Sequence, residues 1–138
     1  MLIAFVLDAS VALGWMLDRP VPTRASFARK LIVEGAKPVV PALWRFEVSN
    51  AVVVAERRGR VTPGQVKTLA ADLEEFEDFA EIDPLAVRYS ILIETARRAR
   101  LTVYDATYLE LAARRRLPLA TLDDRLREAG RKDGLELI

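Results

Sequence analysis

Near its amino terminus the chain reads Leu2-Ile3-Ala4-Phe5-Val6-Leu7-Asp8-Ala9-Ser10, six apolar residues that stop at a carboxylate. A short, unbroken apolar run is typical of a strand buried on both faces of a parallel sheet. Residues 11–17 are apolar at helical spacing, so we expect a central strand that ends at Asp8, just before a helix. Ligands of open α/β sheets bind at the carboxyl ends of the strands. Asp8 is therefore the first candidate for a functional side chain.

The remainder of the chain alternates between predicted helices and predicted strands. We expect helices over residues 23–34, 42–58, 63–78, 85–98, 103–115 and 123–129, and strands over 38–41, 79–83, 117–121 and 135–138. Prolines bound the strand at 38–41, which suits the edge of a sheet or the end of a strand better than a sheet centre. The alternation predicts an α/β fold with a parallel sheet covered on both faces. With 138 residues and no visible linker or repeat, the chain is expected to form a single domain over 1–138.

The composition excludes several classes of site. The sequence contains no cysteine and no histidine, so thiol nucleophiles, disulfides, Ser-His-Asp triads and Cys/His zinc sites are absent. A bound metal would have oxygen ligands, which favours Mg²⁺ or Mn²⁺. No segment is long and apolar enough to span a membrane, and the start lacks the basic segment of a signal peptide. We therefore expect a cytoplasmic protein with no membrane part.

The net charge of +1 conceals an uneven distribution. Seven of the 20 acidic residues lie within 72–83, and 13 acidic residues are left against 21 basic ones. We interpret the acidic helix at Asp72 to Asp78 as a solvated face. Arginines cluster at 57–60, 97–100, 114–116 and 125–131, the last followed by Lys132. These clusters have two interpretations, cations that complement helix carboxyl ends or contacts with nucleic-acid phosphates.

Four carboxylates stand out, and each has a plain structural explanation beside a functional one. Asp8 is well placed to cap the helix that follows it. Glu47 lies on a largely apolar helix stripe, where a buried carboxylate needs an arginine partner or a metal. Asp105 follows Thr102 by three residues, as in a capping box. Asp123 or Asp124 can cap the last helix.

Taken together, the four acids point to one site. Asp8 and Asp123 both follow predicted strands, Asp105 lies in the first turn of a helix, and Glu47 projects from another helix. Carboxylates gathered in one cleft repel one another and are partly protonated unless a cation lies among them. Oxygen ligands around Mg²⁺ resolve that conflict, and the ion can activate a water for attack on a phosphodiester.

Four segments carry a resemblance to a known family. They are Val6-Leu7-Asp8-Ala9-Ser10, then Pro41 with Glu47 and Asn50, then Tyr104-Asp105-Ala106 with Tyr108, Leu109 and Ala112, and finally Pro118-Leu119-Ala120-Thr121 with Asp123 and Leu126. In this order they span almost the whole chain. The sequence resembles the PIN-domain ribonucleases, most closely the VapC-type toxins of bacterial and archaeal toxin–antitoxin pairs.

The resemblance implies a single PIN domain, a three-layer α/β/α sandwich around a parallel sheet. It implies a Mg²⁺- or Mn²⁺-dependent endoribonuclease that hydrolyses RNA with a metal-activated water. The metal site would consist of Asp8, Glu47, Asp105 and Asp123, supported by Ser10, Asn50 and Thr121. The family pattern Thr-x-Asp selects Asp123 over Asp124. The implied partners are an RNA substrate, a cognate VapB-type antitoxin and a second copy of the chain in a homodimer.

Two other functional classes remain open from the sequence. One is a non-catalytic PIN-like scaffold that binds RNA or protein, although all four family acids are present. The other is a phosphatase or phosphoacceptor domain with Asp8 as nucleophile. Ser10 disfavours that class, because phosphatases of the haloacid dehalogenase type have a second Asp at this position. Receiver domains need a lysine late in the sheet, and the only lysine after Lys67 is Lys132.

Overall fold

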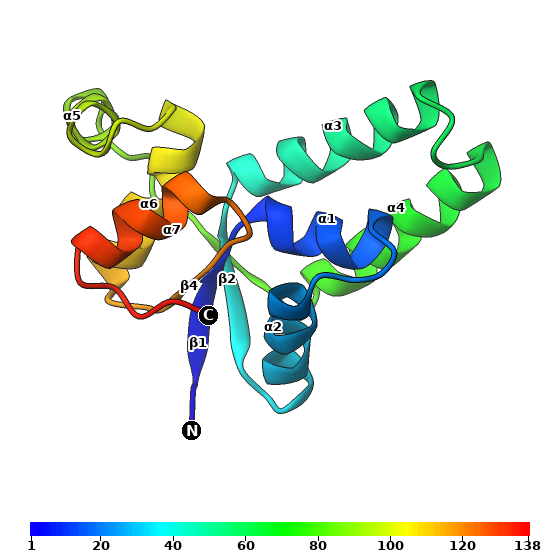
Figure 1. The fold of residues 1–138 in the computed structure, drawn as a ribbon, viewed down its shortest axis with the longest axis horizontal. Helices are drawn as coiled ribbons and strands as arrows, with labels where there is room; N and C mark the ends of the chain where they lie inside the picture. The colour runs from blue at the N-terminus through cyan, green and yellow to red at the C-terminus, as the bar shows by residue number, and fades with distance from the viewer.

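The structure, a computed structural model, describes all residues from Met1 to Ile138 (Figure 1). Strands and helices alternate along most of the chain, as expected. In chain order the elements are β1 (Ala4–Leu7), α1 (Ala9–Leu17), α2 (Thr23–Val33), β2 (Lys37–Pro41), α3 (Leu43–Arg57), α4 (Pro63–Glu77), β3 (Glu81–Asp83), α5 (Tyr89–Ala99), α6 (Val103–Arg115), β4 (Leu119–Ala120) and α7 (Asp124–Lys132).

The four strands form one parallel sheet in the order β3-β2-β1-β4. Strand β1 pairs with β2 on one side and with β4 on the other, and Val6 lies opposite both Val39 and Leu119. Phe5, Val6 and Leu7 are fully buried. The prediction of a central strand that ends at Asp8 is therefore confirmed.

Helices cover both faces of the sheet, which confirms the three-layer α/β/α sandwich (Figure 1). Helices α1 and α2 lie on one side of β1 and β2, and α3 and α4 continue that side, where α1 contacts α3 and α3 contacts α4. Helix α6 packs on β1 and β2 from the opposite side, with α5 and α7 against it. No helix combines the length and apolarity needed to cross a bilayer.

The position of β2 corrects one expectation. The prolines of this strand favoured either the edge of a sheet or the end of a strand, and the edge is wrong because β2 lies between β1 and β3. The sheet tolerates both prolines because Pro38 precedes the first residue of β2 that pairs with β3, and Pro41 lies beyond the last residue that pairs with β1. Between them Val39 and Val40 are fully buried, and the Lys37 N–H donates to the Ile3 carbonyl at 2.8 Å.

Two further predicted elements differ from the structure. Residues 135–138 form no regular strand, only a single parallel bridge between Leu119 and Leu137, because β4 is just two residues long and leaves room for little more. The predicted helix at 85–98 begins instead at Tyr89. Residues 84–88 run without regular structure from the end of β3 to α5, which packs against the far side of α6 (Figure 1).

Candidate active site

Asp8 lies at the carboxyl end of β1 and is only 4% exposed. Its Oδ2 atom accepts two hydrogen bonds, from Ser10 Oγ at 2.5 Å and from Thr121 Oγ1 at 2.6 Å. Asp8 occupies the N-cap position of α1, as its structural explanation predicted, but its side chain makes no capping hydrogen bond. The carboxylate is oriented by two hydroxyls, one from the first turn of α1 and one from the residue that follows β4.

The same two hydroxyls also bind the segment after β4, which leads from Thr121 into α7. Ser10 Oγ accepts the N–H of Leu122 at 3.0 Å, and Thr121 Oγ1 accepts the N–H of Asp123 at 3.0 Å. A hydroxyl has one donor and two acceptor positions, so each can serve both bonds. Ser10 and Thr121, predicted as supporting residues, thus hold Asp8 and Asp123 at the same edge of the sheet.

Asp123 caps helix α7, as its structural explanation required. Its Oδ1 atom accepts the N–H of Leu126 at 2.8 Å. Its Oδ2 atom accepts no hydrogen bond from the protein, so one carboxylate oxygen stays available to a ligand. Asp124 is exposed on the first turn of α7 and makes no such bond.

Glu47 lies half-buried on α3 and has no arginine partner. Its Oε1 atom accepts a short hydrogen bond from the hydroxyl of Tyr108 on α6. Tyr108 is completely buried. Burial, together with the Glu47 carboxylate, raises the pKa of the Tyr108 hydroxyl far above its usual value, so this group stays a proton donor.

Asp105 occupies the first turn of α6, and its N–H donates to Thr102 Oγ1 at 3.1 Å. This bond caps the helix as the sequence predicted, and it uses the backbone of Asp105 rather than its carboxylate. The Asp105 side chain is half-buried. Burial raises the pKa of the Asp105 carboxyl, and the charges of Asp123 and Asp8 raise it further, so these three acids lie within electrostatic range of one another.

The electrostatics of the cluster are unfavourable without a cation. Burial raises the pKa of Asp8, Glu47 and Asp105. Neighbouring charges raise these pKa values further: Asp123 acts on Asp8, Asp8 and Asp105 act on Glu47, and Asp123 and Asp8 act on Asp105. Four carboxylates from four parts of the chain therefore lie within range of one another's charge. A positive ion among them would offset both the cost of burying charged groups and the repulsion between them.

The family model of the PIN domain matches residues 5–132. The chain belongs to the PIN domain family. It is similar in fold to PAE2754 from Pyrobaculum aerophilum, with a TM-score of 0.69 and 21% identity over 92% of this chain and 84% of that chain. It is also similar to FitAcB from Neisseria gonorrhoeae, with a TM-score of 0.67 and 18% identity over 97% and 96% of the two chains. No curated protein matches this sequence significantly. At these identities the two likenesses bear on the fold alone.

The acids of this PIN domain fit a partly hydrated ion better than a closed cage of protein ligands. No three of them lie close enough together to hold one ion directly. Mg²⁺ usually keeps several waters and is bound by one or two carboxylates. The all-oxygen donor set and the raised pKa values of Asp8, Glu47 and Asp105 suit such an ion.

Two residues qualify the predicted site. Asn50 is exposed on α3 and makes no side-chain hydrogen bond, so the structure does not join it to the acids. Tyr108 was not predicted as a site residue, yet it holds Glu47. The signal available in the sequence was its position three residues after Asp105 on one helix face, with a phenol that needs a partner when buried.

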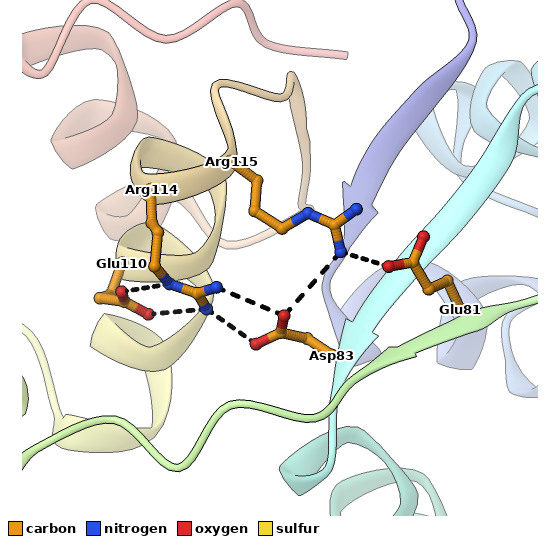
Figure 2. A network of polar contacts seen from close by, with 5 residues as sticks. All are labelled: Glu81, Asp83, Glu110, Arg114 and Arg115. Atoms are coloured by element: carbon orange, nitrogen blue, oxygen red, sulfur yellow. Dashed lines mark hydrogen bonds and ion pairs between the residues drawn. The ribbon is translucent and has the colours of Figure 1, made fainter.

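The arginines of 114–116 are partly consumed by the fold (Figure 2). Arg114 donates to Asp83 at 2.7 Å and to Glu110 at 2.7 Å, and Arg115 binds Glu81. These contacts join the end of α6 to β3 and leave neither guanidinium free for RNA. The acidic residues of α4 are mostly exposed, as the interpretation of a solvated face predicted.

Proposed function

We propose that this PIN domain is a Mg²⁺- or Mn²⁺-dependent endoribonuclease and the toxin of a toxin–antitoxin pair. One observation supports it most. Four acids from four parts of the chain lie at the carboxyl edge of the sheet, and their charges help to raise the pKa values of three of them; the four are Asp8, Glu47, Asp105 and Asp123. Structural acids are normally each matched to a cation or a cap. Only Asp123 among these four has its carboxylate engaged by a helix cap, and none is paired with an arginine.

The side chains of the site divide into ligands and the groups that orient them. The hydroxyls of Ser10 and Thr121 hold the Asp8 carboxylate, Thr121 also accepts the backbone N–H of Asp123, and Tyr108 holds Glu47. A bound divalent ion would supply an activated water and positive charge beside the scissile phosphate. Attack by water on phosphorus with departure of the 3′ oxygen leaves a 5′-phosphate and a 3′-hydroxyl on the products.

The toxin role and its partners rest on the sequence motifs shared with VapC-type toxins. We extend to this chain the expectation of a VapB-type antitoxin that covers the acidic cleft and of a homodimer. A toxin of this class arrests growth when it is made without its antitoxin. Growth arrest can therefore be measured before the RNA target is identified.

The test is induced expression in a bacterial host, with the wild type beside Asp105→Asn and new RNA 5′ ends mapped across the transcriptome. Growth arrest with discrete new 5′ ends, both absent from the variant, supports the toxin ribonuclease. If arrest and new ends persist in the variant, the acids are not the active site. If neither protein produces new ends and the purified wild type binds no Mn²⁺, the non-catalytic scaffold is the better description.

A further inference from the structure

A groove with a volume of about 820 Å³ runs between the carboxyl end of α5 and helix α7. Two of the arginine clusters left open by the sequence meet there, the one at 97–100 and the one at 125–132. Its charged lining residues are Arg98, Arg100, Asp124, Arg125, Glu128, Lys132 and Asp133. The site described above uses none of them.

The ion pairs of the structure separate the occupied charges of the groove from the free ones. Arg98 and Asp133 neutralise each other through two hydrogen bonds, at 2.7 and 3.0 Å. Glu128 is bound by Arg131, which lies outside the groove lining. The remaining charges are Asp124 and three cations.

Those cations are Arg100, Arg125 and Lys132. Each is exposed, and none forms an ion pair or a side-chain hydrogen bond with the rest of the chain. Exposed long cations that the fold leaves unpaired keep their full capacity for phosphate oxygens. With Asp124 counted, the unpaired charge of the groove is net positive.

The groove begins beside the acidic site. Asp124, which lines it, directly follows Asp123, and Arg100 lies two residues before Thr102, which caps the turn that contains Asp105. Helix α6 contacts both α5 and α7 and so fixes the two walls of the groove relative to the acids. A polyanion that enters a site of four carboxylates needs cations close by to offset the repulsion.

We propose that this groove binds the phosphates of the RNA strand that flank the cleavage position, through Arg100, Arg125 and Lys132. The proposal rests on the proposed function and adds the path of the substrate to it. An acidic protein segment also suits unpaired cations. RNA is favoured because the groove adjoins acids suited to phosphodiester hydrolysis, so the strand that is cut must continue past them.

The test compares two triple variants with equal loss of charge. The groove variant is Arg100→Gln, Arg125→Gln and Lys132→Gln, and the control is Arg57→Gln, Arg116→Gln and Lys67→Gln. The control residues are also two arginines and one lysine, exposed and without ion pairs, and none lines the groove. Arg116 matches Arg100 closely, because both have left-handed backbones with φ of 53° and 55° at helix ends.

Binding is measured in EDTA with a fluorescent single-stranded RNA of mixed sequence, at several salt concentrations. Each lost phosphate contact lowers the slope of log K against log salt by about 0.7 for a single strand. We expect the groove variant to lower the slope by about 2 and the affinity by at least tenfold at low salt, while the control stays near wild type. In Mg²⁺ its KM for RNA should rise while kcat stays within about threefold.

Three results would contradict RNA binding in the groove. They are an unchanged salt slope and RNA affinity in the groove variant, an equal loss of RNA affinity in the control variant, or stronger competition for the groove by polyglutamate than by RNA of equal charge. If the wild type cleaves RNA and the groove variant binds RNA as the wild type does, the groove inference alone is wrong. A wild type that binds RNA through the groove but cleaves nothing removes the proposed function alone. If the triple variant fails to fold, Arg100→Gln and Lys132→Gln singly must each lower the slope by about 0.7.

Discussion

One carboxylate oxygen of Asp8 accepts hydrogen bonds from two hydroxyls, and one carboxylate oxygen of Glu47 accepts a hydrogen bond from the Tyr108 hydroxyl. Neither arrangement neutralises the carboxylate, because a hydroxyl donates a hydrogen bond but carries no positive charge. Each of these acids is therefore oriented without a positive partner. Such a design costs stability in the absence of a cation and is expected of a metal site rather than of a structural one.

Conservative substitution of the four acids should abolish cleavage and leave the fold intact. Asp8→Asn, Glu47→Gln, Asp105→Asn and Asp123→Asn each remove a charge without removing volume. Loss of groups that merely orient metal ligands costs roughly 10- to 100-fold, so loss of an acid itself should cost more. Cleavage of a labelled RNA in Mg²⁺ measures the effect. Asp124→Asn should lose far less, and a larger loss there than at Asp123 would reverse our choice between the two.

Tyr108→Phe tests the group that holds Glu47. The variant keeps the buried ring and loses the hydroxyl that donates to Glu47. We expect cleavage to fall by roughly 10- to 100-fold, with weaker Mn²⁺ binding in a calorimetric titration. Tyr104→Phe is the matched control, because Tyr104 lies on the same helix and is 62% exposed. Wild-type Mn²⁺ affinity in Tyr108→Phe would assign this tyrosine to the core alone.

The raised pKa values predict how stability depends on pH. In the metal-free protein Asp8, Glu47 and Asp105 have pKa values above their usual range, first because of burial. The folded state then binds protons more tightly than the unfolded chain, so stability falls as pH rises from the usual carboxyl range toward the raised pKa. In EDTA at pH 7, Asp8→Asn should melt at a higher temperature than the wild type, and the difference should vanish near pH 4. A less stable variant at pH 7 would contradict the repulsion that we infer.

The acids and the supporting hydroxyls of Ser10 and Thr121 were singled out from the sequence, whereas the bonds that join them, and the role of Tyr108, were not. Asp8, Glu47, Asp105 and Asp123 each sit at a recognisable place in a strand or helix, so position and residue type drew attention to them. The bond from Tyr108 to Glu47 joins residues 61 apart, and the bond from Thr121 to Asp8 joins residues 113 apart. Pairings at such separations depend on how the helices pack on the sheet, which local periodicity does not specify.

The joint between β3 and α6 positions the helix that contributes Asp105 and Tyr108 (Figure 2). Asp83 is 8% exposed at the end of β3, and both arginines of the joint reach it, Arg114 at 2.7 Å and Arg115 at 3.8 Å. Ion pairs of this kind fix geometry more than they add stability. Two arginines that the sequence left open between structure and RNA are thereby assigned to the fold.

Asp83→Ala should destabilise the protein by about 1–3 kcal/mol. The substitution leaves Arg114 with Glu110 only, and breaking a buried pair costs about 3–5 kcal/mol, reduced here because the arginine is partly exposed. Urea denaturation measures the change. Glu94→Ala is the control, because it removes the exposed pair with Arg97, which should be worth less than about 1 kcal/mol. Equal effects of the two substitutions would show that the joint does not hold α6.

Element order was largely predictable, and element placement was less so. Thr102 caps the start of α6 as the sequence predicted, and α4 begins at Pro63, the residue from which that helix was expected. The prolines of β2 lie near its two ends, which was one of the two alternatives from the sequence, and only the register excludes the other, an edge strand. The absence of a strand at 135–138 follows from the shortness of β4, which no pattern within that segment reveals.

In the molecule as a whole, the acids of the site come from both halves of the chain. Asp8 directly follows β1, and Glu47 lies within α3. Asp105 lies in the first turn of α6, and Asp123 directly precedes α7; these elements are labelled in Figure 1. The central sheet joins these halves because β1 pairs with both β2 and β4. The unpaired cations of the groove lie on the α5–α7 side. The net charge of +1 is therefore unevenly distributed, with the acidic site beside the groove of unpaired cations.

The chemistry of the RNA ends made by the purified protein tests the central claim most directly. A labelled RNA is incubated with wild type and Asp105→Asn in Mg²⁺ and in EDTA, and the new ends are identified by enzymatic phosphorylation and ligation. Hydrolysis by activated water predicts 5′-phosphate and 3′-hydroxyl ends in the wild type with Mg²⁺ alone. Ends with 5′-hydroxyl and 2′,3′-cyclic phosphate, or cleavage that survives in EDTA or in Asp105→Asn, would contradict a metal-dependent site built on these four acids.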